Sequence, residues 1–127
     1  MDIIKRATCC LDTYALVEIA LENNQFKDLL KRPFIVPDMA LAEFYGLMLQ
    51  RQGAQKAEEI CRRFEFYSIP TPTRLLIDAV VMRKKHKKAN FSLTDTAGYV
   101  LARHLKLPFI TGDKSFKEFP GVEFRSK

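Results

Sequence analysis

The sequence lacks a long apolar run and has few cysteines. No stretch approaches the roughly 18 apolar residues that a membrane-spanning helix needs, and residues 1–6 contain no apolar centre like that of a secretory signal. The cysteines are not spaced like zinc ligands, and adjacent cysteines do not readily form a disulfide with each other. We therefore expect a soluble, cytoplasmic protein whose Cys9, Cys10 and Cys61 are buried, reduced thiols.

Repeats and low-complexity segments are also missing. The chain has 127 residues, of which 47% are hydrophobic and 28% charged. This composition is typical of one globular domain with a core large enough to fold without cross-links. We predict a single domain over residues 1–127.

Acidic residues are fewer than basic residues. Lys and Arg number 21 against 15 Asp and Glu, which gives a net charge of +6, and the densest basic run covers residues 83–88. Such an excess favours a polyanionic partner, although a charge run is also typical of a solvated helix face. The candidate contacts to a polyanion are Lys84, Lys85, Lys87 and Lys88.

Short apolar runs alternate with segments of helical periodicity along the chain. Continuous apolar runs are typical of strands covered on both faces, and their alternation with helices favours a parallel or mostly parallel sheet between helical layers. We predict strands at 7–11, 34–36, 66–69 and 122–124, and one that ends before Asp113. We predict helices at 14–21, 26–30, 38–52, 54–64 and 75–88, one that starts after Ser92, and a short helical turn at 116–119.

Three predicted helix starts carry polar residues that are suited to capping. Asp38 is the predicted N-cap of the helix at 38–52, and Thr71 or Thr73 that of the helix at 75–88. Ser92 and Asp95 match a capping box, in which each side chain accepts a hydrogen bond from the backbone N–H of the other residue. Capping alone therefore accounts for Asp95.

Two predicted strands stop at an acid. The first strand ends at Asp12, and the strand in the last quarter of the chain ends at Asp113. The carboxyl ends of parallel strands are where α/β folds usually hold their sites. Taken singly, Asp12 is also explained as a helix cap and Asp113 as a turn residue.

One predicted helix carries an acid on an apolar face. Glu43 shares a face with Ala40 and Leu47 at helical spacing. A carboxylate there must be solvated, paired or bound to a ligand, because an unpaired buried carboxylate costs several kcal/mol. The alternative is a position at the margin of the apolar stripe. The other helix acids, which we predict to be exposed or cap-like, are Glu18, Glu22 and Asp78.

Taken together, the four acids predict a metal site. Acids gathered at one rim repel one another unless cations lie among them, and Mg2+ and Mn2+ take oxygen ligands, often with one or two direct carboxylates. The predicted ligands are Asp12, Glu43, Asp95 and Asp113. The candidates to orient carboxylates through hydrogen bonds are Thr13 and Thr111.

At these residues the sequence resembles the PIN domain family, and within it the VapC-type ribonuclease toxins. The resemblance rests on LDT at 11–13, LAEF at 41–44, SLTDTA at 92–97 and ITGDKSF at 110–116, in the order that the family has. It covers nearly the whole chain, and the Thr-x-Asp-x-x-Phe pattern of the last segment is its most specific part.

The resemblance implies a three-layer α/β/α sandwich with a parallel sheet, and RNA cleavage that depends on Mg2+ or Mn2+. It implies that the four acids named above form the family's catalytic quartet. It also implies a homodimer and a small antitoxin protein whose tail covers the site. Two residues depart from the pattern: Tyr14 replaces a residue that is frequently small and polar, and Ser115 stands where some relatives have a further acid.

We therefore expect a metal-dependent endoribonuclease whose basic run contacts RNA phosphates, an interaction that weakens as salt rises. The alternative is a catalytically inactive PIN-fold module that binds RNA or another protein, which the intact quartet disfavours. A phosphoryl-transfer enzyme of the haloacid dehalogenase type is disfavoured because Tyr14 replaces the second acid expected two residues after Asp12.

Overall fold

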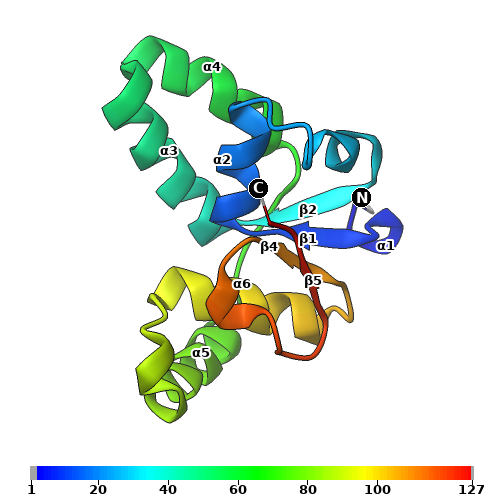
Figure 1. The fold of residues 1–127 in the computed structure, drawn as a ribbon, viewed down its shortest axis with the longest axis vertical. Helices are drawn as coiled ribbons and strands as arrows, with labels where there is room; N and C mark the ends of the chain where they lie inside the picture. Colours follow the sequence, from blue (N-terminus) through cyan, green and yellow to red (C-terminus); the bar gives the residue numbers. More distant parts are fainter. Residues whose placement is uncertain (1–2, 127) are drawn as a thin grey trace.

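Five parallel strands form the central sheet of the computed structural model, which describes residues 3–126 (Figure 1). The strand order is β3-β2-β1-β4-β5, and each neighbouring pair is parallel. The predicted parallel sheet is therefore confirmed. The strands are β1 (Cys9–Leu11), β2 (Phe34–Pro37), β3 (Ser68–Ile69), β4 (Phe109–Thr111) and β5 (Val122–Phe124).

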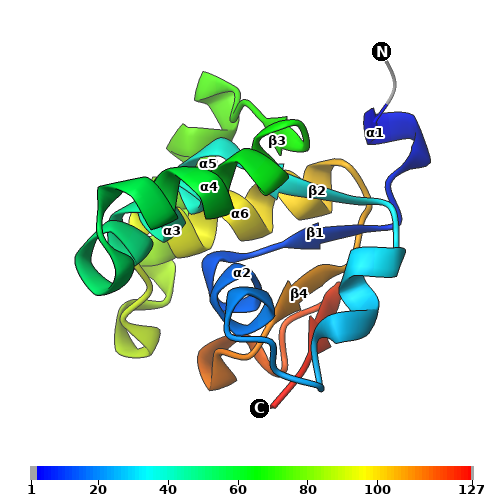
Figure 2. The same ribbon diagram turned by 90° about the horizontal axis from the view of Figure 1, so that it is seen from above.

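Alternate strand residues face two separate cores. Cys9 and Leu11 belong to one core and Cys10 to the other, because successive strand side chains point to opposite faces. Helices α2, α3 and α4 cover the first face, and α5 and α6 cover the second, which gives the predicted three layers (Figures 1 and 2). The α-helices are α1 (Ile3–Arg6), α2 (Thr13–Ala20), α3 (Asp38–Gln52), α4 (Ala54–Glu65), α5 (Thr73–Lys85) and α6 (Leu93–His104), and the 3-10 helices are η1 (Lys27–Lys31), η2 (Lys87–Ala89) and η3 (Lys114–Phe116).

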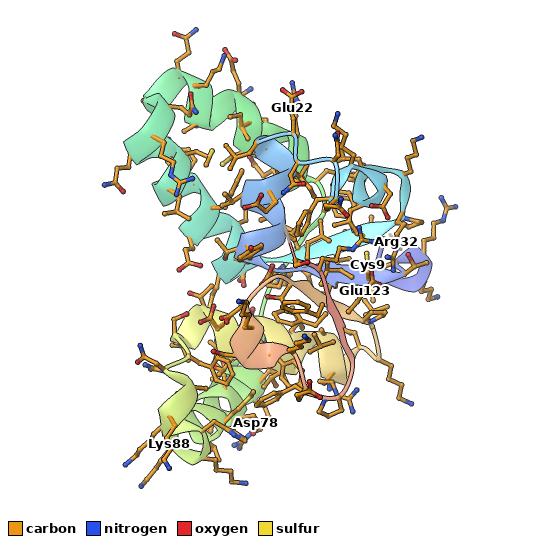
Figure 3. All side chains as sticks on the ribbon, viewed as in Figure 1. Cys9, Glu22, Arg32, Asp78, Lys88 and Glu123 are labelled. Atoms are coloured by element: carbon orange, nitrogen blue, oxygen red, sulfur yellow. The ribbon has the colours of Figure 1, made fainter. Side chains whose placement is uncertain are left out.

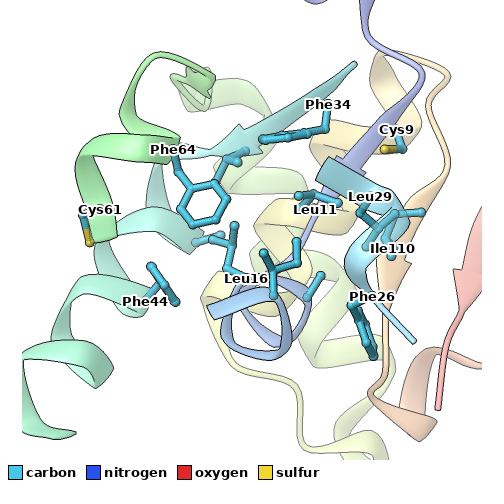
Figure 4. Close-up of a cluster of buried hydrophobic side chains, with 14 of the residues drawn as sticks. Cys9, Leu11, Leu16, Phe26, Leu29, Phe34, Phe44, Cys61, Phe64 and Ile110 are labelled. Atoms are coloured by element: carbon cyan, nitrogen blue, oxygen red, sulfur yellow. The ribbon is translucent and has the colours of Figure 1, made fainter. Parts of the chain in front are cut away.

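The core under α2, α3 and α4 fixes the segment that carries Asp12 (Figure 4). Phe44 and Phe64 meet edge to face with ring centroids 5.7 Å apart, and Leu11 and Leu16 are fully buried. Each such burial contributes roughly 1.5–3 kcal/mol. Leu11 and Leu16 lie on either side of Asp12 in the sequence, so their burial holds the β1–α2 junction in place.

An aromatic cluster fixes the segment that follows β4. The Phe116 ring of η3 stacks on Phe91 with centroids 4.3 Å apart and lies 5.5 Å from the Tyr99 ring of α6. The Tyr99 hydroxyl donates a hydrogen bond to the Pro120 carbonyl at 2.6 Å. Because η3 begins directly after Asp113, the cluster ties the Asp113 turn to α6.

Two helix starts differ from the prediction. Asp38 is the first helical residue of α3 rather than its cap, since Pro37 occupies the cap position, and the Asp38 carboxylate accepts a hydrogen bond from the Thr71 hydroxyl at 2.6 Å. Neither Thr71 nor Thr73 caps α5, because the cap position belongs to Pro72 and makes no side-chain hydrogen bond. Asp38 and Thr71 therefore join the starts of two helices instead of capping one each.

Several elements are shorter or tighter than predicted. The helix predicted at 26–30 is the 3-10 helix η1, and the strand predicted at 66–69 contracts to the two residues of β3, which pairs with β2 at one edge of the sheet. Helix α5 ends at Lys85 rather than at residue 88. The chain turns there at His86, whose ring packs 5.1 Å from the Phe119 ring.

Ion pairs hold the last strand at the opposite edge of the sheet. Arg125 pairs with Asp28 of η1 at 2.6 Å and with Glu123 of β5 at 2.8 Å. Arg32 pairs with Glu123 at 3.1 Å, and Figure 3 shows these two side chains together near Cys9. The predicted edge strand at 122–124 is confirmed, and charged side chains fasten it to η1.

The predictions for the cysteines are confirmed, since Cys9, Cys10 and Cys61 are buried free thiols. Among the helices of residues 3–126, none is long and apolar enough to cross a membrane.

Candidate active site

The strand order creates a switch point between β1 and β4. From β1 the chain proceeds to β2 and β3 on one side of the sheet and then to β4 and β5 on the other. Leu11 pairs with Ile110 at the carboxyl ends of these two strands. Ligands of open α/β sheets bind in the crevice outside such a point. Asp12 follows β1 directly and Asp113 lies just beyond β4, so the sheet itself brings these acids to one place.

Asp12 is held rigidly at the start of α2. It is the N-cap residue, and its Oδ1 accepts a hydrogen bond from the Ala15 backbone N–H at 2.8 Å. Its backbone N–H donates to the Ile110 carbonyl at 3.2 Å, and the Thr111 hydroxyl bonds to its carboxylate. The residue is only 9% exposed. The predicted capping role of Asp12 is confirmed.

Burial raises the pKa of Asp12 to about 7. The neighbouring carboxylates of Asp95 and Asp113 raise it further, whereas the hydrogen bonds from Thr111 and Ala15 act in the opposite direction. A buried acid that is also repelled by like charges retains its proton longer than a free one. Three of the four predicted acids therefore lie close enough for their charges to interact.

Asp95 and Asp113 also carry out capping roles. Asp95 completes the predicted capping box, because its Oδ2 accepts from the Ser92 N–H at 2.9 Å and its own N–H donates to Ser92 Oγ at 3.0 Å. Asp113 Oδ1 accepts from the Ser115 N–H at 2.9 Å. In each case the capping bond engages one carboxylate oxygen. Capping and ligand binding are therefore compatible for the same side chain.

Glu43 lies on the open side of the same site. It is an exposed residue of α3, which agrees with the alternative that it occupies the margin of the apolar stripe. All four predicted acids line one open groove of about 660 Å³. The residues that line it come from α2 and its N-cap, from α3, from the start of α6 and from the turn after β4.

Comparisons with known proteins address the fold of the chain. No protein-family model matches the sequence, and no curated protein sequence is significantly similar to it. Solved structures do match. VapC20 of Mycobacterium tuberculosis, a Sarcin-Ricin loop cleaving toxin, is 16% identical, and the match covers 92% of this chain and 98% of that chain with a TM-score of 0.79. The chain has a VapC-type PIN fold.

Two further structures share this PIN fold. A chain of a toxin-antitoxin complex from Klebsiella pneumoniae is 20% identical, with 91% of this chain and 95% of that chain covered and a TM-score of 0.73. PAE2754 from Pyrobaculum aerophilum is 12% identical, with 93% and 90% covered and a TM-score of 0.67. The likeness in fold therefore extends over nearly all of each chain.

The groove of this PIN fold contains charged residues that sequence reasoning did not select. Glu18 was predicted to be exposed, yet it is 5% exposed, lines the groove and accepts a hydrogen bond from Asn23 Nδ2 at 2.9 Å. Arg51 and Lys114 also line the groove. The spacing of Tyr14, Val17 and Glu18 along one helical face is the signal that places Glu18 beside the site.

The two threonines differ in their contacts. Thr111 is fully buried, and its Oγ1 accepts from the Asp113 N–H at 3.0 Å while its hydroxyl bonds to Asp12. It therefore contacts both strand-end acids. The Thr13 hydroxyl instead donates to the Ala40 carbonyl at 3.4 Å, and so joins α2 to α3.

The donor set of the PIN-fold groove is suited to a hydrated, hard cation. Within residues 3–126, no three His, Cys, Asp or Glu side chains are grouped closely enough to hold one ion jointly. Mg2+ and Mn2+ keep several waters and bind through one or two carboxylates, so such an ion would contact only one or two of these acids directly. The donors are carboxylate oxygens, which these ions prefer.

The basic run lies beside the Asp113 segment of the PIN fold. Its four candidate lysines are exposed at the end of α5 and in η2, and Figure 3 shows Lys88 projecting from this part of the molecule. The Ser115 hydroxyl donates to the Ala89 carbonyl at 3.5 Å, which joins η3 to η2. The positive residues are thus attached to the turn that carries Asp113.

Proposed function

We propose that this protein is a metal-dependent endoribonuclease that cleaves RNA phosphodiester bonds, and the cytoplasmic toxin of a toxin-antitoxin pair. The observation that carries the proposal is the convergence of Asp12, Asp95 and Asp113 at the switch point of a PIN fold, where burial raises the pKa of Asp12 and repulsion from the other two carboxylates adds to the shift. A divalent cation relieves this repulsion. The shared fold of VapC20, a Sarcin-Ricin loop cleaving toxin, supports nucleolytic chemistry.

In this proposal Asp12, Asp95 and Asp113 bind a hydrated Mg2+ or Mn2+, one or two of them directly and the rest through its waters, and Glu43 binds it through water or orients the attacking water. When bound, the ion lowers the pKa of a coordinated water and screens the charge that develops on the phosphate. Asp12, whose pKa is raised to about 7, must lose its proton before it serves as a ligand. Thr111 keeps the Asp12 carboxylate in place.

The positive residues near the groove would bind the RNA backbone. Lys114 lines the groove next to Asp113, and the neighbouring η2 segment extends the positive surface away from the acids. Phosphate contacts of this kind weaken as salt rises. The residues assigned to this role are Lys84, Lys85, Lys87, Lys88 and Lys114.

The proposed protein partners are an antitoxin and a second copy of the chain. The Klebsiella toxin-antitoxin complex contains a chain of this fold, which supports an antitoxin. Helix α5 exposes Ile77, Val80 and Val81, with 45%, 54% and 48% of each residue accessible, and this apolar strip supports a homodimer. Co-purification with the product of an adjacent small reading frame tests the first partner, and sedimentation of the isolated protein tests the second.

The enzymatic proposal is tested by Mn2+-dependent cleavage of several RNAs. Asp12→Asn and Asp113→Asn are expected to lower the rate by at least about 100-fold, since loss of even an outer-shell contact to a metal ligand costs 10–100-fold. Asp78→Asn is the matched control, because Asp78 is an exposed acid on α5 that pairs with Arg74. Unchanged cleavage by either site variant would contradict the assignment.

The second candidate function is a catalytically inactive PIN-fold module that binds RNA or another protein. Ser115 favours it, since some relatives carry a further acid there and the Ser115 hydroxyl instead donates to the Ala89 carbonyl. Binding of RNA by the wild-type protein, without metal-stimulated cleavage of any substrate tested, would support this candidate.

A further inference from the structure

The Tyr14 ring lies directly against the backbone of Gly112. A methyl group built on Gly112 would lie 2.7 Å from Cδ1 of Tyr14 and closer still to Cε1 and Cζ. Gly112 is not among the residues with a positive φ in residues 3–126, so its backbone conformation is open to other residues. The ring contact is therefore what requires glycine at this position.

This contact joins the two segments that carry the strand-end acids. Tyr14 lies in the first turn of α2, two residues after Asp12, and Gly112 immediately precedes Asp113. The pairing of β1 with β4 extends only to Leu11 and Ile110, followed by the hydrogen bond from the Asp12 N–H to the Ile110 carbonyl. Beyond that bond, the Thr111 hydroxyl contacts Asp12, and the packing of Tyr14 on Gly112 adds a second bridge between the two segments.

The Tyr14 ring is supported from within the molecule. It packs against Phe26, which is fully buried, with ring centroids 6.1 Å apart. Tyr14 also lines the groove. A ring with two rotatable bonds, backed by a buried neighbour, acts as a spacer of fixed thickness between α2 and the turn after β4.

We propose that Tyr14 is a positioning residue that sets the separation between the Asp12 and Asp113 carboxylates by packing on Gly112. The inference rests on the proposed function, because it assigns the spacing to a divalent-metal site. Tyr14 and Gly112 form a matched pair: the large residue after Asp12-Thr13 is accommodated by the absence of a side chain at position 112. A methyl at 112 forces either the ring into the groove or the turn away from β1, and both movements change the site.

The test is a double-mutant cycle read by direct Mn2+ titration of the folded protein. Gly112→Ala is expected to weaken Mn2+ binding by about 10–100-fold, as changes around metal ligands do. Gly46→Ala is the matched control, because nothing lies within 4 Å of a methyl at that exposed helical position. The double variant Tyr14→Ala/Gly112→Ala should bind Mn2+ within about twofold of the single variant Tyr14→Ala. The methyl at position 112 then has no Tyr14 ring to displace. Circular dichroism confirms that each variant is folded.

Two outcomes overturn the inference. One is a Gly112→Ala variant that binds Mn2+ like Gly46→Ala, and the other is an equal effect of the methyl with and without the Tyr14 ring. If the wild-type protein binds no Mn2+, the proposed function is wrong. The positioning role of Tyr14 is then tested separately by crystal structures of the wild-type and Gly112→Ala proteins. The Asp12–Asp113 carboxylate separation should then differ between Gly112→Ala and wild type, and an unchanged separation refutes the positioning role.

Discussion

The acids at the β5 edge of the sheet and the acids in the groove lie in opposite electrostatic environments. At the β5 edge, Arg125 and Arg32 pair with Asp28 and Glu123, and the pKa of Asp28 is lowered, chiefly by its hydrogen bond with Arg125. In the groove, Asp12 is buried among other acids and its pKa is raised to about 7. The ion-paired cluster fastens a strand, whereas ionisation of the buried Asp12 carboxyl costs stability. The direction of the pKa shift therefore distinguishes Asp28 in the ion-paired cluster from Asp12 in the groove.

Asp12→Asn should give the largest change in stability. Asp12 loses its proton near pH 4 in the unfolded chain but near pH 7 in the folded one, so the folded state binds more protons between these values and stability falls as pH rises through them. Asparagine keeps a cap for the Ala15 N–H and removes the charge. At pH 8 without metal, the variant should be more stable by up to about 4 kcal/mol, since one pKa unit is about 1.4 kcal/mol.

Urea unfolding of the Asp12→Asn and wild-type proteins at pH 4 and pH 8 measures this difference. The two proteins should be nearly equal at pH 4, where Asp12 is protonated in the folded wild type and only about half ionised in the unfolded chain. A variant that is less stable than wild type at pH 8 would show that the Asp12 charge is already compensated.

Metal affinity should depend on pH for the same reason. The Asp12 carboxyl must release its proton to bind Mn2+, so affinity should rise by up to about tenfold per pH unit between pH 5 and 7 and level off above. Calorimetric titrations in buffers of different ionisation enthalpy measure the proton release. Affinity that is constant over this range would place the metal away from Asp12.

Arg125→Met should destabilise the paired cluster by about 1–3 kcal/mol. The Arg125 side chain is only 18% exposed, and its loss leaves Glu123 with Arg32 as partner and Asp28 without its Arg125 ion pair. Chemical unfolding measures the change, and Mn2+ binding should be preserved. A loss of Mn2+ affinity would show that the two charged regions are coupled.

The smallest effect is expected at the exposed pair of α5. Arg74→Gln should change stability by no more than about 0.5 kcal/mol, because Arg74 and Asp78 form an i,i+4 pair with side chains 71% and 48% exposed. A thermal midpoint within a few degrees of wild type would agree with this value. A change as large as that of Arg125→Met would show that exposure is a poor guide to the strength of these pairs.

The fold was predictable because its signals are local. Apolar runs such as the one that ends at Leu11 identify strands buried on both faces, and their alternation with helices requires parallel crossovers. Asp12 and Asp113 were selected for the same reason, since a residue that follows a buried strand is placed at the rim of the sheet by that strand alone. The capping box of Ser92 and Asp95 is likewise contained within four residues.

The remaining features depend on contacts between distant segments. Asp38 binds Thr71 across 33 positions, so a local capping rule assigned both residues incorrectly. The burial of Glu18 and the exposure of Glu43 follow from how α2 and α3 pack, which the sequence spacing of either helix leaves open. The need for glycine at Gly112 arises from a ring almost a hundred positions earlier in the chain.

The central strand β1 is synthesised early and its neighbour β4 late. The pairing of Cys10 with Phe109 therefore joins segments that are separated by most of the chain. During synthesis, a chain that has reached the end of α6 has Asp12 and Asp95 but neither Asp113 nor the strand that places it next to Asp12. The acid cluster therefore forms only when the final segment emerges and docks. A nascent or prematurely terminated chain therefore lacks the assembled acid cluster until β4 is in place.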